Sequence, residues 1–163
     1  MFNHKKIFKT LILFPPLLII GCSTATHTAV YIKPNQAVVL DSTCAETITN
    51  QCSRDCFKID SSWNPGIEDI RDMELNYWSL YELSKKNISA ISDINRFYRQ
   101  YAGIYYKGVK LIYINAMPVE ENMCRNLDKE PCIICDGGTE YWGALYNPKT
   151  NKFSRLSFNG AAY

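Results

Sequence analysis

The sequence has few histidines, and none falls where we expect the folded domain. Its two histidines are His4 and His27, in the N-terminal segment that we assign below to a signal peptide and a tether. Without histidine, a domain has no Ser-His-Asp or Cys-His arrangement, no histidine base and no histidine ligand for zinc or iron. The sequence also lacks GxxxxGK[ST], GxGxxG and EF-hand motifs. We therefore expect no cofactor and no metal, and we favour a protein that is not an enzyme.

An excess of charge of either sign is also missing. The chain has 18 basic and 16 acidic residues, and Lys5, Lys6 and Lys9 lie in the N-terminal segment, which holds no acidic residue. Without those three lysines, 15 basic residues face 16 acidic ones. A nearly neutral domain has no basic surface for nucleic acid, which excludes that class of partner. Apolar residues make up 47% of the chain and charged residues 21%, which is typical of one globular domain.

The N-terminal apolar run is too short to cross a membrane as a helix. Residues 10–20 form a run of about eleven residues, whereas a spanning helix needs roughly twenty. The run follows three lysines and precedes Gly21, which is the order of regions in a signal peptide. Residues 18–22, Leu-Ile-Ile-Gly-Cys, resemble the lipobox of bacterial lipoproteins, in which the cysteine becomes the lipidated first residue of the mature chain. An ordinary secretory signal peptide is the alternative.

We therefore expect a signal peptide at residues 1–21, lipidation at Cys22, a lipidated tether at residues 22–29 and a single domain at residues 30–163. Several acyl chains on one cysteine anchor stably, because each buried methylene contributes about 0.8 kcal/mol. By resemblance to Gram-negative lipoproteins, Ser23 in place of an aspartate implies the outer membrane, with the domain facing the periplasm. Retention in the inner membrane and exposure at the cell surface are alternatives.

Six cysteines remain after Cys22, and an even number in an exported domain predicts disulfide bonds. They are Cys44, Cys52, Cys56, Cys124, Cys132 and Cys135. The alternative is a structural metal site, because Cys52 with Cys56, and Cys132 with Cys135, have the spacing of metal ligands. An oxidising compartment favours three disulfide bonds over metal. We expect a Cys124–Cys135 bond, because these cysteines flank the loop that joins two expected hairpins.

The first half of the domain predicts two strands, a loop and one long helix. Residues 30–32 and 37–40 have strand composition. Residues 41–62 hold three cysteines and few apolar residues, which predicts an irregular loop pinned by disulfide bonds. Asn64 can cap a helix that starts at Pro65 and runs to the lysines before residue 87. Apolar side chains then recur on one helix face. They are Ile67, Ile70, Met73, Tyr77 and either Leu80 or Tyr81.

The second half of the domain predicts two β-hairpins. Residues 99–106 and 109–116 have strand composition and flank Lys107-Gly108, a two-residue turn with glycine second. Residues 139–146 and 152–158 flank a turn that starts with Asn-Pro. The sequence therefore predicts an α+β domain, with one main helix packed on an antiparallel sheet of four or more strands and stabilised by disulfide bonds.

Polar and charged residues lie among aromatic ones in three segments of the second half. The segments are Arg99-Gln100-Tyr101, residues 136–143 (Asp-Gly-Gly-Thr-Glu-Tyr-Trp-Gly) and Phe158-Asn159-Gly160. Because amphipathic aromatic side chains are favoured at interfaces, we expect a binding surface here. Its candidate residues are Arg99, Tyr101, Asp136, Tyr141 and Trp142. The alternatives are an ion pair of Arg99 with Asp136 or Glu140, and a Trp142 that packs in the core.

Four segments of the domain form a characteristic pattern. They are residues 98–104 (YRQYAGI), 108–116 (GxKxIYINA), 135–146 (CDGGxxYWGALY) and 158–160 (FNG). This pattern resembles a group of small bacterial lipoproteins, over roughly residues 63–161. The resemblance implies an exported, lipidated domain and no particular reaction, because the group has no established function.

Two classes of function follow. The first is an envelope lipoprotein whose domain binds or supports an envelope protein or glycan without catalysis. The second is an envelope hydrolase that uses carboxylates such as Asp136 and Glu140. A hydrolase needs two carboxylates in one concave pocket, whereas a binding protein needs a surface that its partner can reach.

Overall fold

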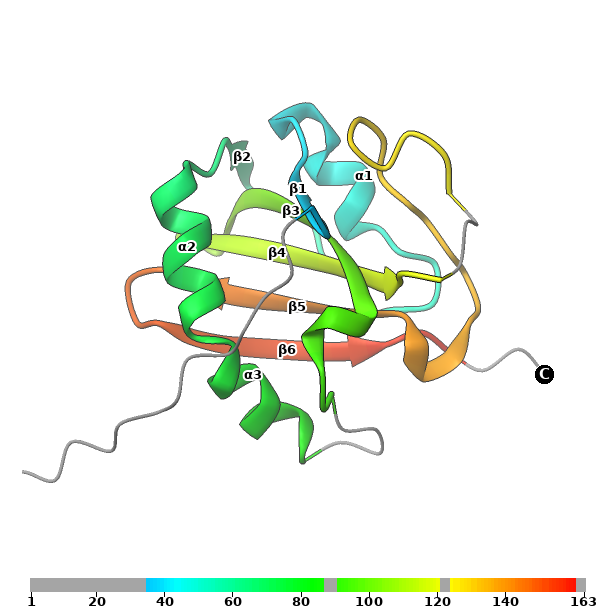
Figure 1. Cartoon of the computed structure of the whole chain (residues 1–163). Helices are drawn as coiled ribbons and strands as arrows, with labels where there is room; N and C mark the ends of the chain where they lie inside the picture. The colour runs from blue at the N-terminus through cyan, green and yellow to red at the C-terminus, as the bar shows by residue number, and fades with distance from the viewer. Residues whose placement is uncertain (1–34, 87–90, 121–123, 161–163) are drawn as a thin grey trace, which may run out of the picture.

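The computed structural model describes residues 35–86, 91–120 and 124–160 of the chain. These residues form one β-sheet with helices on both of its faces, so the predicted α+β class is confirmed (Figure 1). The expected signal peptide, Cys22, the tether and the strand at residues 30–32 lie outside the described residues. Within the described part of the chain, no helix combines the length and the apolar character needed to span a membrane.

The sheet contains an antiparallel meander of four strands. They are β3 (Phe97–Tyr106), β4 (Val109–Pro118), β5 (Trp142–Asn147) and β6 (Lys152–Phe158). Two short strands, β1 (Ala37–Val39) and β2 (Ser61–Trp63), lie one after the other along the outer edge of β3. β2 is antiparallel to β3, but β1 is parallel to it. The sheet is therefore mixed and the prediction of a purely antiparallel sheet is wrong, because the long connection from β1 to β3 returns the chain to the same end.

Both predicted hairpins are present. Lys107 and Gly108, at the tip of the first, have positive φ angles of 52° and 71°, as a type I′ turn requires. In the second hairpin, β5 begins at Trp142 rather than at Thr139. The reason is that Gly138–Glu140 form a short 3-10 helix, η3, before the strand.

The predicted single helix is divided into α2 (Ile67–Leu75) and α3 (Tyr77–Ser84). Between them, Asn76 leaves the helical conformation, with φ −99° and ψ 9°. The side chain of Asn76 donates a hydrogen bond at 2.7 Å to the backbone carbonyl of Asp72. In an unbroken helix that carbonyl would accept from the backbone N–H of Asn76 itself. A local side-chain bond therefore replaces the helical one and ends α2.

The helix also starts later than the sequence predicts. Gly66, not Asn64, is the residue before α2, and the carboxylate of Asp69 accepts from the Gly66 N–H at 2.9 Å. The Asn64 side chain instead accepts a hydrogen bond from the backbone N–H of Ser42 at 3.0 Å. Four of the five residues predicted for the buried face are buried, whereas Ile67 in the first turn is 77% exposed.

Residues 41–62 are only in part the irregular loop that the sequence predicts: residues 50–60 hold no helix or strand and are pinned by a disulfide bond at Cys52, but most of the rest is regular. They contain a 3-10 helix, η1 (Ser42–Cys44), the short helix α1 (Ala45–Thr49) and the start of β2. Ile48 of α1 is fully buried against the sheet. A helix of five residues holds too few apolar positions to produce a periodic pattern in the sequence.

Disulfide bonds form, but not in the predicted pattern. Cys52 bonds to Cys135 and Cys124 bonds to Cys132, whereas Cys44 and Cys56 are free. The predicted Cys124–Cys135 pair is wrong, because Cys135 bonds to Cys52 of the segment after α1 and Cys124 bonds to Cys132. Cys52–Cys135 links positions 83 residues apart, and closing such a loop contributes about 4.5 kcal/mol in the chain-entropy model. Among the described residues, no group of three or more side chains could hold a metal ion.

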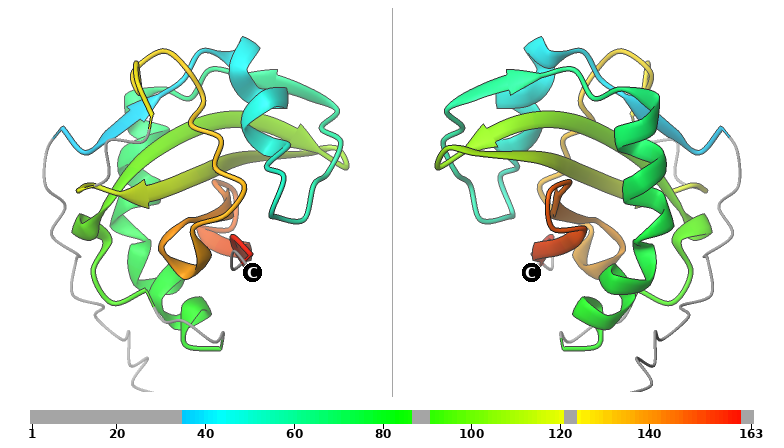
Figure 2. Two further views of the ribbon diagram at one scale, coloured as in Figure 1. Left: turned by 90° about the vertical axis from the view of Figure 1, so that its right-hand side faces the viewer. Right: turned by 90° about the vertical axis from the view of Figure 1, so that its left-hand side faces the viewer.

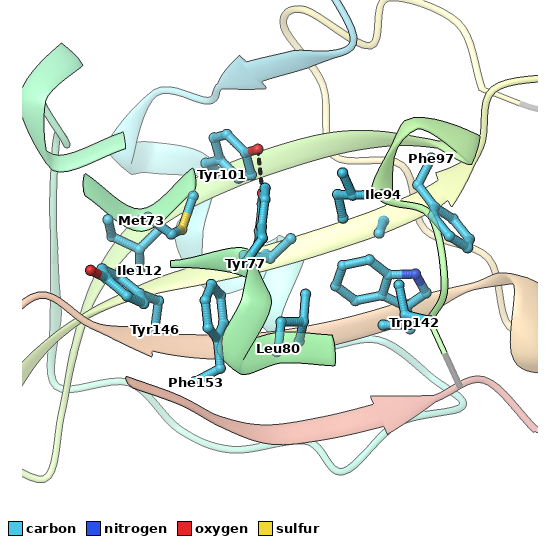
Figure 3. Packing of buried hydrophobic residues seen from close by; sticks show 14 of the residues in the cluster. Met73, Tyr77, Leu80, Ile94, Phe97, Tyr101, Ile112, Trp142, Tyr146 and Phe153 are labelled. Atoms are coloured by element: carbon cyan, nitrogen blue, oxygen red, sulfur yellow. Dashed lines mark hydrogen bonds between the residues drawn. The ribbon is translucent and has the colours of Figure 1, made fainter. Parts of the chain in front are cut away.

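Alternate residues of β3 enter two different clusters of apolar side chains. Phe97 and Tyr101 lie on the face covered by α2 and α3, here called the α2 face (Figure 3). Ala102 and Ile104 lie on the opposite face, here called the α1 face. α1 and α2 lie on opposite sides of the sheet (Figure 2). The arginine site proposed below for a ligand is on the α1 face.

Candidate functional site

The predicted binding residues do not form one accessible surface. Arg99 and Trp142 are 0% exposed, and Tyr101 and Tyr141 are buried as well. Tyr101 and Trp142 belong to the cluster on the α2 face, whereas Tyr141 packs in a separate cluster with Met117. Asp136 is the exposed member of the five. The aromatic residues that favoured a binding surface pack in the interior instead. A partner therefore cannot reach the four buried side chains.

Arg99 is held in a network of phenolic and backbone oxygens. Its Nε donates to the Tyr101 hydroxyl at 2.9 Å, and its Nη1 donates to the carbonyls of Ile94 and Phe97 at 3.0 and 3.1 Å. The Tyr101 hydroxyl in turn donates to a carboxylate oxygen of Glu74 at 2.9 Å and lies 2.7 Å from the Tyr77 hydroxyl (Figure 3). Burial raises the pKa of Tyr101 well above its usual value. The neutral Tyr101 hydroxyl therefore lies between the Arg99 guanidinium and the Glu74 carboxylate and forms a hydrogen bond with each.

The predicted pairing of Arg99 with Asp136 or Glu140 is replaced by a different ion pair. Glu140 pairs with Arg96 at 3.1 Å, and both side chains are largely exposed. Glu140 and Asp93 line a pocket of about 160 Å³ between the start of β3 and η3. The Asp93 carboxylate accepts from the backbone N–H of Asn95 at 2.9 Å, and Asp136 is not among the lining residues. The pair that the hydrolase hypothesis requires, Asp136 with Glu140, is therefore not brought together in this pocket.

A network of buried amide side chains lies on the α1 face. Gln100 of β3 and Asn115 of β4 are opposite each other in the sheet and share a hydrogen bond at 3.1 Å. Asn115 also donates to the carbonyl of Cys132 at 2.9 Å, and Gln100 donates to the carbonyl of Glu130 at 2.7 Å. Near the end of β6, Asn159 donates to the carbonyl of Asp136 at 2.8 Å. These bonds fix the segment that follows β4 against the sheet.

Arg54 completes this network. Its Nε donates to Asn159 at 2.6 Å, and its Nη1 donates to Asn115 at 2.9 Å and to the Tyr113 hydroxyl at 3.1 Å. Gly143 of β5 leaves room for this arrangement. A Cβ at that position would lie 2.6 Å from the Tyr113 hydroxyl and 2.8 Å from the Arg54 Nη1. Two strands, β4 and β5, together with Asn159 just after β6, therefore set the position of one guanidinium group.

Arg54 lies in the wall of a pocket of about 240 Å³, here called the arginine pocket. Its lining residues are Arg54, Asp55, Phe57, Tyr113, Leu145, Arg155, Leu156 and Ser157. Arg155 belongs to a bulge of β6, where the pairing with β5 shifts between Gly143 and Leu145. The guanidinium carbon of Arg155 lies 5.1 Å from the centre of the Phe57 ring, in cation–π geometry. The pocket thus combines two guanidinium groups with an apolar wall.

Among the described residues, no carboxylate pairs with the positive charge of Arg54. The ion pairs found among the described residues include neither Arg54 nor Arg155. Burial lowers the pKa of Arg54, and the Tyr113 hydroxyl partly offsets that effect. Burial also raises the pKa of Tyr113, so this phenol is neutral at physiological pH. Arg54 therefore remains a partly buried cation whose described partners are neutral.

The arginine pocket suits binding better than proton transfer. Arginine and tyrosine keep one protonation state near neutral pH, and Asp55 is the one carboxylate among the lining residues. Sequence reasoning selected the segments that contain Gly143 and Asn159 but missed Arg54. Its only sequence signal was its place between Cys52 and Cys56, in a segment expected to be an irregular loop.

Comparisons of the chain with protein-family models, with curated proteins and with solved structures gave no match.

Proposed function

We propose that this protein is a bacterial envelope lipoprotein, held at the outer membrane through a lipidated Cys22, whose domain is a non-catalytic binding module. The proposed localisation is supported by the order of charged, apolar and small residues at residues 1–21. The ligand site is the arginine pocket, in place of the surface that the sequence predicts around Trp142. The ligand is small, or is a small group on a larger envelope protein or glycan.

The observation that carries the proposed site is the fixed position of Arg54. Three hydrogen bonds at 2.6, 2.9 and 3.1 Å hold a partly buried guanidinium at a pocket wall without an ion-pair partner among the described residues. Burying a cation costs free energy unless it is paired. Arg54 bears this cost at the wall of a pocket, where an anionic ligand can supply the missing partner. Its guanidinium is already fixed in position before the ligand binds, as in other preorganised sites.

Lipidation at Cys22 and attachment to the membrane can be tested directly. Cells that express the protein with labelled palmitate should incorporate label into it, and Cys22→Ala should abolish the labelling and release the protein from the membrane fraction. Label retained in Cys22→Ala would contradict lipidation at this residue.

The proposed site is tested by filling the pocket. Ser157 lines the pocket and forms none of the hydrogen bonds that hold Arg54, so Ser157→Phe should fill the space without removing a charge. Purified full-length lipidated protein in detergent micelles is titrated calorimetrically with small acids, amines and neutral sugars. We expect at least one class to bind the wild type and none to bind Ser157→Phe. Binding that is unchanged in Ser157→Phe would place the ligand site elsewhere.

A further inference from the structure

The arginine pocket presents two kinds of surface to one ligand. Arg54 and Arg155 supply positive charge, and Phe57 and Leu145 of the α1-face cluster supply apolar contact. At about 240 Å³, the pocket is smaller than the roughly 300–1,000 Å³ of sites for drug-sized ligands. A ligand that satisfies both surfaces in this space has an anionic end and a small apolar body.

The hydrogen bonds of Arg54 leave part of its guanidinium available. Those described use Nε and Nη1 and none uses Nη2, which carries two further N–H donors. The bonded edge faces Asn115, Asn159 and Tyr113. An anion in the pocket can therefore bind Arg54 without displacing any of its protein partners, and no reorganisation of the network is needed.

The backbone at Arg155 gives a second, independent observation. Arg155 has a φ of +49°, a left-handed conformation that is strained for an L residue and natural for glycine. Glycine at this bulge would relieve the strain, yet the chain has an arginine whose guanidinium lies over the Phe57 ring. Backbone strain of this kind is concentrated at binding and catalytic sites. The side chain of Arg155 is therefore placed at the pocket in spite of this backbone strain.

The identity of the anion follows from the charges around it. Asp55 also lines the pocket, and its carboxylate repels a dianion more strongly than a monoanion. A carboxylate is a planar monoanion that matches the donors of a guanidinium. We infer, on the basis of the proposed function, that the arginine pocket binds a carboxylate attached to a small apolar group, between Arg54 and Arg155. The carboxylate belongs to a free organic acid or to the end of a larger molecule.

The experiment compares ligands that share a phenyl ring and differ in the polar group attached to it. Full-length lipidated protein in detergent micelles is titrated with benzoate, benzamide and phenyl phosphate at low salt. Benzoate should bind at least tenfold more tightly than either of the other two. A peptide that ends in phenylalanine, tested as free acid and as amide, separates the two sources of the carboxylate. Binding of benzoate alone indicates a free acid, and binding of the peptide acid indicates a larger partner. If benzamide or phenyl phosphate binds as tightly as benzoate, the inference is wrong.

Variants of the two arginines test the same inference. Arg155→Asn removes the charge but keeps a residue that tolerates a positive φ, so the fold should be retained. Benzoate binding should weaken about tenfold or more, which is the scale of a charge-assisted hydrogen bond. Arg54→Gln should have at least this effect. Arg71→Gln is the matched control, because Arg71 pairs with Glu68 on α2, on the other face of the sheet, and should not change binding.

The outcomes separate this inference from the proposed function. If Ser157→Phe abolishes binding of a neutral ligand while Arg54→Gln and Arg155→Asn leave it unchanged, the pocket is the site but the ligand is not a carboxylate. If benzoate binds equally to the wild type, to Ser157→Phe and to both arginine variants, the proposed site and the inference are both wrong.

Discussion

Gly143 gives the sharpest test of the arrangement beneath the arginine pocket. Its backbone φ is not in the left-handed region, so an alanine there causes no backbone strain. The added Cβ would lie 2.6 Å from the Tyr113 hydroxyl and 2.8 Å from the Arg54 Nη1. Both contacts are far shorter than ordinary van der Waals contact, so Gly143→Ala must move at least one of these groups, and we expect the hydrogen bond between them to be lost.

The expected loss of stability can be worked from these contacts. Overpacking of a buried site costs about 1–3 kcal/mol, and loss of a hydrogen bond to a charged group costs about 1.5–3 kcal/mol. Alanine regains roughly 0.5–1 kcal/mol relative to glycine within a strand. Because the overpacking and the lost bond are one event, these terms overlap. We expect Gly143→Ala to lower the free energy of unfolding by about 2–3 kcal/mol, a fall of about 4–12 °C in Tm for a domain of this size.

The assay is urea unfolding followed by tryptophan fluorescence, with Gly160→Ala as the matched control. A Cβ at Gly160 would meet no atom within 4 Å, so this variant should stay within about 0.5 kcal/mol of the wild type. Equal stability of Gly143→Ala and Gly160→Ala would refute the placement of Arg54 and Tyr113 over β5.

Three further predictions concern the core, the cysteines and the tyrosines. Trp142→Ala should destabilise the domain by about 3–5 kcal/mol in urea unfolding, because the ring is 0% exposed; a loss below about 1 kcal/mol would mean that the ring is not in the core. Thiol titration of the unreduced, denatured protein should find two free thiols in the domain, Cys44 and Cys56, and zero or four would contradict the disulfide pattern. Burial raises the pKa of Tyr77 and of Tyr101, so both stay protonated in the folded state after the unfolded chain ionises near its ordinary value of about 10. The two tyrosines should therefore leave the free energy of unfolding unchanged below about pH 10. Above it, each should lower the free energy of unfolding by up to about 1.4 kcal/mol per pH unit. Urea unfolding from pH 8 to 11 measures this, and a free energy of unfolding that stays constant above pH 10 would contradict it.

The sequence predicted features that depend on neighbours in the chain. The Lys107-Gly108 turn is an example, because two adjacent residues with positive φ are sufficient to fold a hairpin back on itself. The buried face of the helices is another, because Ile70, Met73 and Tyr77 recur with the helical period. The break at Asn76 was missed, since a helical period continues across one residue whose side chain competes for a backbone carbonyl.

The predicted binding residues do not share one surface, because side chains alternate between the two faces of a sheet along a strand. Arg99, Gln100 and Tyr101 are adjacent in the sequence, but successive side chains of a strand point to opposite faces. Arg99 and Tyr101 therefore enter the α2 face and Gln100 the α1 face. Composition alone does not distinguish an aromatic side chain that packs in a core from one that meets a partner.

What the sequence by itself determined is local: the four strands of the meander, the hairpin turns, the apolar helix faces, the near-neutral charge and the pattern that predicts export. What only the tertiary structure decided is which distant side chains meet. Arg54 and Asn159 are separated by 105 positions and share a hydrogen bond at 2.6 Å, and Cys52 pairs with Cys135 across 83 positions. Such contacts depend on strand register and on which face a loop covers, and these are set by the burial of the whole sheet rather than by any short segment.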